Sequence, residues 1–136
     1  MRRSKISLDK VQEAFNSAIK RRDKRCLIRD YEPCCGQLEA SHFFSAGGSP
    51  ALRFYPPNCH AQCQHHHWKH HNDRDFQKTD YYGLFMEKNH GEDLEYMEFA
   101  RHCCIKYTDE LKAEIIRLCN ADKLDELKEL IEEILG

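Results

Sequence analysis

The feature that most constrains this chain is the concentration of cysteine and histidine in one part of it. Of the eight cysteines and nine histidines, five cysteines and seven histidines fall between Cys26 and His71. Secreted small proteins use cysteines for disulfides, whereas a reducing cytosol favours metal sites or free thiols. The clustering of both residue types in one segment therefore indicates metal binding rather than ordinary core packing.

Length and hydropathy bound the class of protein. The 136 residues fit one domain with a helical extension, and a hydrophobic fraction of 40% allows a modest core. The sequence contains no run of eighteen apolar residues, so we expect no membrane span. The basic N-terminus has no apolar stretch typical of a secretory signal, so we expect a cytoplasmic protein.

The charge is distributed unevenly along the chain. Residues 1–25 contain nine Lys or Arg against three acids, whereas residues 108–136 contain nine acids against four bases. A basic segment can follow a line of phosphates, which makes this one a candidate DNA contact. The alternative is a solvated helix end. The candidate side chains are Lys20, Arg21, Arg22, Lys24 and Arg25.

Hydrophobic periodicity and turn residues predict the elements of the N-terminal half. Ser7 is a typical N-cap for a helix that runs to about Lys24. The apolar segments 38–44 and 51–55 are separated by a Gly/Ser/Pro-rich loop, which indicates a two-stranded hairpin. Pro56 and Pro57 then require a turn, and a helix is expected over residues 64–72.

The C-terminal half is expected to be helical. Thr79 could cap a short helix, residues 92–105 could form another, and Thr108 should start a helix through Leu118. Residues 122–135 have amphipathic spacing. Their apolar face fits packing within the chain or a homodimer.

Four residues in the Cys/His-rich segment have a spacing that suggests one site. His42 ends the first predicted strand, and Asn58 follows the double proline. His67 and His71 are four residues apart, so on a helix both imidazoles face the same side and can bind one ion. A hairpin packed against that helix would bring His42 toward the same ion.

This segment resembles the HNH nucleases, whose module is called ββα-metal. Within that group the motifs are most similar to phage recombination nucleases of the NinG (Rap) type, and the resemblance covers roughly residues 35–71. The stretches that carry it are Leu38-Glu39-Ala40-Ser41-His42-Phe43-Phe44, Leu52-Arg53-Phe54 and Asn58-Cys59-His60-Ala61-Gln62-Cys63.

The resemblance implies an α+β fold. A ββα-metal module at residues 26–73 would lie between a basic N-terminal helix (1–25) and a helical C-terminal extension (74–136), in one compact domain. It also implies a metal-dependent DNA endonuclease of phage or prophage origin. Such an enzyme would act on branched or recombination-intermediate DNA in the cytoplasm of a bacterial or phage-infected cell.

Residue roles follow from the same resemblance. His42 would be the general base, and Asn58 would fasten the loop and orient His42. His67 and His71 would bind the catalytic ion. Glu39 would support the metal site, and Ser41 stands where many members have Asp or His.

The identity of the catalytic ion and the role of one arginine are left open by the sequence. Mg²⁺ prefers oxygen ligands, whereas imidazole suits Mn²⁺, Zn²⁺ or Ni²⁺ better. Arg53 is a candidate phosphate contact, with a salt bridge as the alternative.

A structural zinc is a second expectation from the resemblance. Cys63 and His66 offer a Cys-x₂-His half-site, and Cys35 resembles the end of the other. Three residues before Cys35 stands Glu32 rather than cysteine. Cys34 or Cys26 would therefore have to supply the fourth ligand.

Several residues have plainer interpretations. His60 is a rival metal ligand, whereas His90 and His102 are expected to be structural or exposed. Trp68 is expected in the core or over the metal-bearing face. The alternative function is a zinc-stabilised nucleic-acid-binding module without catalysis. Such a module needs the zinc ligands but not His42 followed by Asn58.

Overall fold

The N-terminal helix forms as the sequence predicts. The computed structural model describes residues 5–136, so residues 1–4 of the basic segment lie outside the described part. Helix α1 (Leu8–Asp23) begins at Ser7, whose Oγ accepts the backbone N–H of Lys10. It ends where Lys24 adopts a left-handed conformation with φ 63°. Its apolar side, which includes Phe15 and Ile19, is fully buried.

The hairpin exists, but its second strand is not the one that the sequence predicted. Strand β1 (Leu38–His42) pairs antiparallel with β2 (Cys59–Cys63), in a register that sets His42 opposite Cys59. The expected strand at residues 51–55 is wrong. That segment starts with a 3₁₀ turn, η1 (Pro50–Leu52), and a second turn, η2 (Pro56–Asn58), leads into β2.

The apolar run at residues 51–55 fills the core instead of pairing. Leu52, Phe54 and Tyr55 are all completely buried. Prolines on both sides of the run fix φ and lack the N–H that a ladder needs. Burial without strand pairing satisfies the same hydrophobic pattern, which explains the misassignment.

Helices α2 to α5 come directly after β2. Helix α2 (Gln64–Asn72) has the predicted bounds and is capped by the Sγ of Cys63. Helix α3 (Arg74–Thr79) is capped by Asp73, and α4 (Tyr81–Asn89) is capped by Asp80 rather than by Thr79. Helix α5 (Gly91–Ala100) ends five residues before the expected Ile105.

The last two helices complete the core. Thr108 caps α6 (Asp109–Asn120) as predicted, and α7 (Leu124–Leu135) follows after a short turn. Leu127 and Ile131 of α7 are fully buried in the main core, so much of the predicted apolar face packs within the chain. The Tyr55 hydroxyl also donates to Glu132 of α7, at 2.5 Å.

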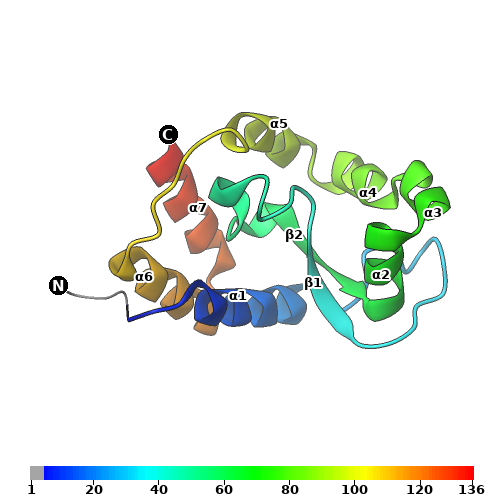
Figure 1. Ribbon diagram of the computed structural model, residues 1–136, viewed down its shortest axis with the longest axis horizontal. Coiled ribbons are helices and arrows are strands. Elements are labelled where there is room, and N and C mark those ends of the chain that lie inside the picture. Colours follow the sequence, from blue (N-terminus) through cyan, green and yellow to red (C-terminus); the bar gives the residue numbers. More distant parts are fainter. Residues whose placement is uncertain (1–4) are drawn as a thin grey trace.

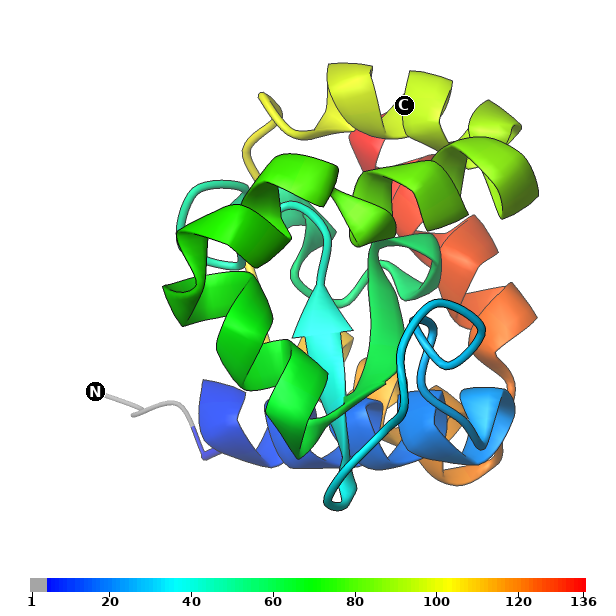
Figure 2. The ribbon, with the colours of Figure 1, turned by 90° about the vertical axis from the view of Figure 1, so that its right-hand side faces the viewer.

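The hairpin lies at the centre of this α+β arrangement. Helix α1 runs along one side of the two strands beside α6, while α2 and α3 lie at the other end of the molecule (Figure 1). The turned view shows α2 beside the hairpin and the α4–α5 arm crossing above both strands (Figure 2). Within residues 5–136, every helix is too short or too polar to cross a bilayer.

The outer edge of β2 is bound by the chain that leaves α1. Arg22 donates to the Cys59 carbonyl at 2.6 Å, and Asp23 accepts the Ala61 N–H at 2.8 Å. The Leu27 N–H donates to the Ala61 carbonyl at 2.9 Å. Residues 22–27 therefore satisfy the backbone groups along this edge.

Candidate metal and catalytic sites

Three cysteines and one histidine converge between the loop after α1 and the start of α2. They are Cys26, Cys34, Cys63 and His66, and their ligand atoms all lie within 4.8 Å of one another. Cys63 closes β2 and His66 lies in the first turn of α2, so the Cys-x₂-His spacing turns both side chains to one side. The loop brings Cys26 and Cys34 to the same place.

The distances in this cluster suit a tetrahedral zinc. His66 Nδ1 lies 3.2, 3.4 and 4.0 Å from the sulfurs of Cys63, Cys26 and Cys34. Zinc bonds of about 2.05 Å to nitrogen and 2.3 Å to sulfur put tetrahedral N and S ligands about 3.6 Å apart. The cluster could therefore hold a metal ion such as zinc with little movement.

The pKa values of the three thiols affect how the cluster binds a metal. Burial raises the pKa of Cys26 to about 12 and also raises the pKa of Cys34. Burial would raise the pKa of Cys63 too, but hydrogen bonds from the backbone of His66 and Cys35 and from the other two thiols outweigh it and lower that pKa. Without a metal, Cys63 is the thiol that ionises first, and a bound cation would release the other protons.

The second nitrogen of His66 points toward an acid. His66 Nε2 is buried without a hydrogen-bond partner in the described part of the chain, and Glu32 Oε1 lies 3.8 Å away. Lys69 holds the same carboxylate at 3.2 Å. When Nδ1 binds a metal, Nε2 carries the proton, and an acid on that side stabilises the ligand.

One expected zinc ligand lies outside the cluster. Cys35 is exposed and is absent from the group, whereas both Cys26 and Cys34 belong to it. The Cys35 carbonyl instead accepts the His65 N–H at 3.2 Å, which fastens the loop to α2. Gly36 follows with φ 90°, and a side chain there would press on Gln64. The peptide backbone around Cys35, rather than its thiol, supports the site.

The side chain of His42 is fixed at the end of β1. Its ring stacks on Phe15, and its Nε2 lies 2.8 Å from the Arg53 carbonyl. A carbonyl only accepts, so Nε2 carries the proton and Nδ1 of the neutral ring has a free lone pair. Burial, together with the charges of Arg53 and His67, lowers the pKa of His42.

Asn58 fastens the loop between the strands. It is fully buried, its Oδ1 accepts the Phe44 N–H at 2.8 Å, and its Nδ2 donates to the carbonyls of Phe44 and Leu52 at 2.9 and 3.1 Å. These bonds tie residues 44 and 52 of the loop to Asn58. The amide reaches His42 only indirectly, because it shapes the loop whose Arg53 carbonyl binds that imidazole.

His67 and His71 lie side by side on α2. Their Nε2 atoms are 3.1 Å apart, and His67 Nδ1 lies 3.0 Å from a carboxylate oxygen of Glu39. A carboxylate on Nδ1 favours the tautomer with its lone pair on Nε2, toward His71. Two imidazoles on one tetrahedral ion lie about 3.3 Å apart. The spacing of the two nitrogens is therefore close to that of two ligands on one ion.

Ser41 lies on β1, two residues after Glu39, and is buried. It is 1% exposed, and its Oγ has no hydrogen-bond partner among residues 5–136. Alternation along β1 sets Ser41 and Glu39 on the same face of the sheet. The serine therefore offers an uncommitted oxygen on the side of the hairpin that carries Glu39.

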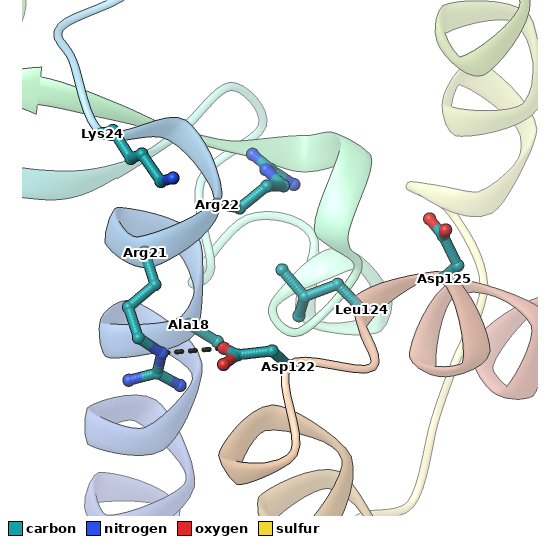
Figure 3. Close-up of a pocket in the computed structure, with 7 residues that line it drawn as sticks. All are labelled: Ala18, Arg21, Arg22, Lys24, Asp122, Leu124 and Asp125. Atoms are coloured by element: carbon teal, nitrogen blue, oxygen red, sulfur yellow. Dashed lines mark hydrogen bonds and ion pairs between the residues drawn. The ribbon is translucent and has the colours of Figure 1, made fainter.

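Two of the predicted DNA-binding arginines have partners inside the molecule. Arg21 pairs with Asp122 at 2.7 Å across a cavity of about 700 Å³ between α1 and the start of α7 (Figure 3). Arg22 pairs with Asp23 at 2.7 Å and donates to the carbonyls of Pro56 and Cys59. Lys24 and Arg25 are exposed at the end of α1, and Lys20 is partly exposed.

Arg53 and Trp68 also differ from expectation. Arg53 ends a 3₁₀ turn rather than lying within a strand, and it donates to Gln12 at 2.8 Å instead of forming a salt bridge. Trp68 is 60% exposed on α2 and is not a core residue. Its exposed ring lies one residue from His67.

The sequence also gave little sign of one histidine pair. His60 on β2 and His90 before α5 bring their Nε2 atoms within 3.2 Å. Thirty residues separate them, and only the path of α3 and α4 brings them together. His90 stands directly before a helix that begins with glycine, where it resembles an ordinary helix cap. No local sequence signal therefore indicated that it contacts His60.

The comparisons with known proteins identify a family. No curated protein and no solved structure gives a significant match to the chain. A family model described as "Bacteriophage Lambda NinG protein" matches residues 2–131, which is nearly the whole sequence. That family is a phage family related to recombination. The chain, with a Cys₃His cluster that could hold a metal, therefore belongs to the NinG family.

Proposed function

We propose that this protein is a metal-dependent DNA endonuclease that acts on branched or recombination-intermediate DNA. The observation that carries the proposal is the His67–His71 pair, with Nε2 atoms 3.1 Å apart and Glu39 behind His67. His42 lies on the same strand as Glu39, on the opposite face, and its free Nδ1 suits a base.

His42 would take a proton from the attacking water. Its lowered pKa keeps the imidazole neutral near pH 7, so the base is present without prior deprotonation. The hydrogen bond to the Arg53 carbonyl fixes the tautomer and orients Nδ1. That same carbonyl stabilises the imidazolium after proton transfer, because the bond from Nε2 is then charge-assisted.

The other residues would position the reaction. A divalent ion bound by His67 and His71 would supply positive charge to the scissile phosphate and the leaving oxygen. Glu39 holds the His67 ring so that Nε2 points outward. Asn58 keeps the loop closed around His42 through its three hydrogen bonds. These contacts fix the groups before substrate arrives, which is what efficient catalysis requires.

The surroundings of α2 suit a large substrate. His71 is exposed and Trp68 is 60% exposed, so neither is enclosed in a small-molecule pocket. An exposed indole can stack on a base, which favours DNA with unpaired or splayed nucleotides. Membership of a phage family related to recombination supports a branched substrate.

The decisive experiment is a cleavage assay over duplex, single-stranded, flapped and four-way DNA, with Mg²⁺, Mn²⁺, Zn²⁺ and Ni²⁺ tested separately. We expect cutting of a branched substrate. His42→Ala should lose about 10²–10⁴-fold in rate, the usual contribution of a general base, while DNA affinity stays unchanged. The matched control His102→Ala, at an exposed position, should cut like the parent.

Two results would contradict the proposal. If His42→Ala cuts at the parental rate, His42 is not the base. If the parent binds DNA but cuts none of the substrates with any metal, the protein is a zinc-stabilised binding module. In that case the Cys₃His cluster alone would explain the metal ligands.

A further inference from the structure

A second pair of imidazoles lies away from the proposed active site, between β2 and the junction of α4 and α5. His60 is 3% exposed, and its Nε2 lies 3.2 Å from the Nε2 of His90. The ring centroids are 4.7 Å apart and the planes are inclined by 46°. The facing nitrogens, rather than stacked rings, make the contact.

The other nitrogen of each ring is already bound. The Tyr82 hydroxyl donates its one proton to the Ser41 carbonyl at 2.7 Å. It must therefore accept from His60 Nδ1, 3.2 Å away. His90 Nδ1 lies 3.3 Å from Asp93 Oδ2, which likewise only accepts while it is ionised. Both neutral rings thus carry their proton on Nδ1.

Two lone pairs then face each other at Nε2. At 3.2 Å they repel unless a cation lies between them, and the candidates are a shared proton or a metal ion. Ligands on one tetrahedral zinc would be about 3.3 Å apart for two imidazoles. We infer that His60 and His90 form a further binding site for a divalent transition metal of the zinc type, with Asp93 orienting His90.

The arrangement around His90 is typical of a metal ligand. A histidine that binds a metal through one nitrogen usually donates the other N–H to a carboxylate. Asp93 takes this part and is itself held by Lys128, whose Nζ lies 3.8 Å from its second oxygen. Tyr82 plays the equivalent part for His60, and its own bond to Ser41 fixes the direction of donation.

The surroundings leave room for the remaining ligands. A cavity of about 450 Å³ opens on both histidines, and its lining includes the carboxylates of Asp93 and Asp125. Water can complete the coordination there, as is usual for sites with few protein ligands. Of the cations that line this cavity, Arg22 is engaged by Asp23 and Lys128 by Asp93 and Glu132. Burial, Arg22 and His90 lower the pKa of His60 well below its usual value, so His60 keeps a lone pair available at neutral pH.

Such a metal would tie the helical arm to the hairpin. His60 is the second residue of β2, and His90 lies at the point where α4 passes into α5. Within residues 5–136, the Tyr82–Ser41 bond is another link between α4 and the strands. A metal at His60 and His90 would fix the far end of α4 as well.

The test counts bound zinc. Full-length protein is dialysed against a zinc series, and metal and protein are measured in the same samples. We expect His90→Ala to bind one zinc fewer per chain than the parent, while His102→Ala binds the same number. Asp93→Asn keeps both imidazoles and should weaken this one site about 10–100-fold. None of these changes touches His67, His71 or the cysteine cluster, so the result does not depend on DNA cleavage.

The outcomes distinguish a metal ion bound between the two histidines from a proton shared by them. If His90→Ala and Asp93→Asn bind zinc like the parent, the pair shares a proton and the proposal is overturned. If His90→Ala fails to fold, as judged by circular dichroism, Asp93→Asn decides the question through its affinity. A zinc-dependent shift of the His60 and His90 ring nitrogens in ¹⁵N NMR spectra would locate the ion directly, and unshifted rings at full zinc occupancy would refute it.

Discussion

Asn58→Ala is the substitution whose cost follows most directly from the structure. The change removes three hydrogen bonds, to the Phe44 N–H and to the carbonyls of Phe44 and Leu52. Each such bond contributes about 1 kcal/mol to stability, and a buried group left without a partner costs more. Because Asn58 is fully buried, water cannot replace the lost amide. We expect the free energy of unfolding to fall by about 3 kcal/mol.

Urea unfolding at constant metal concentration measures this loss. The matched control is Asn89→Ala, since Asn89 makes one exposed bond, from its Nδ2 to the Phe85 carbonyl. Such surface changes usually stay within about 0.5 kcal/mol. Asn58→Asp is the informative second variant. It keeps an acceptor for Phe44 but loses the two donated bonds, so its stability should also fall.

Loss of the Asn58 amide should also affect His42, because Asn58 holds the loop that binds the His42 ring. Asn58 shapes the segment that ends in the Arg53 carbonyl, and this carbonyl holds His42. In Asn58→Ala the His42 ring should lose its fixed tautomer, which ¹⁵N NMR of the ring detects. An unfolding free energy equal to that of Asn89→Ala, with an unchanged His42 ring, would show that the amide network does not hold the loop.

Three further predictions concern charge. Burial lowers the pKa of His42 in the folded protein. As the pH falls, the unfolded chain therefore takes up a proton at His42 at a higher pH than the folded chain does. Stability should therefore decline as the pH falls below about 6.5, and His42→Asn should reduce that slope, as followed by urea unfolding. Chelation of zinc should lower the unfolding temperature. Zinc affinity should weaken toward acid pH, because Cys26 and Cys34 bind only as thiolates, and calorimetry at several pH values would test this relation. Replacement of both Lys24 and Arg25 by alanine should reduce the salt dependence of DNA binding by about two phosphate contacts if both touch the backbone, and an unchanged slope in fluorescence titrations would leave them as a solvated helix end.

Local signals predicted most of the helices, but not α3. Ser7 and Thr108 each cap the helix that the sequence assigned to them, because a short polar side chain before an apolar period satisfies orphan N–H groups. The i, i+4 spacing of His67 and His71 likewise fixed their mutual geometry once α2 formed. These features depend on residues a few positions apart, which is the range over which a sequence pattern has direct physical meaning.

Long-range packing accounts for the errors. The run 51–55 is apolar enough for a strand, but nothing local shows whether a buried segment pairs or packs, and Leu52 and Tyr55 pack. The real strand, Cys59–Cys63, is short and half polar, so its pattern was weak. In the metal cluster, the conformation of the loop after α1 brings Cys26 and Cys34 to the site and leaves Cys35 outside it. That conformation includes a left-handed Gly36, and residue spacing does not predict it.

The hydrogen bonds between residues 22–27 and β2 affect how easily another strand could pair with the hairpin. A lone hairpin presents two open strand edges, and an open edge is a template for the strand of another molecule. Here Arg22, Asp23 and Leu27 occupy the hydrogen-bonding groups of Cys59 and Ala61 that a foreign strand would need. The turn that ends the first helix thus covers one edge of this two-stranded sheet, and Arg22 takes part in that cover.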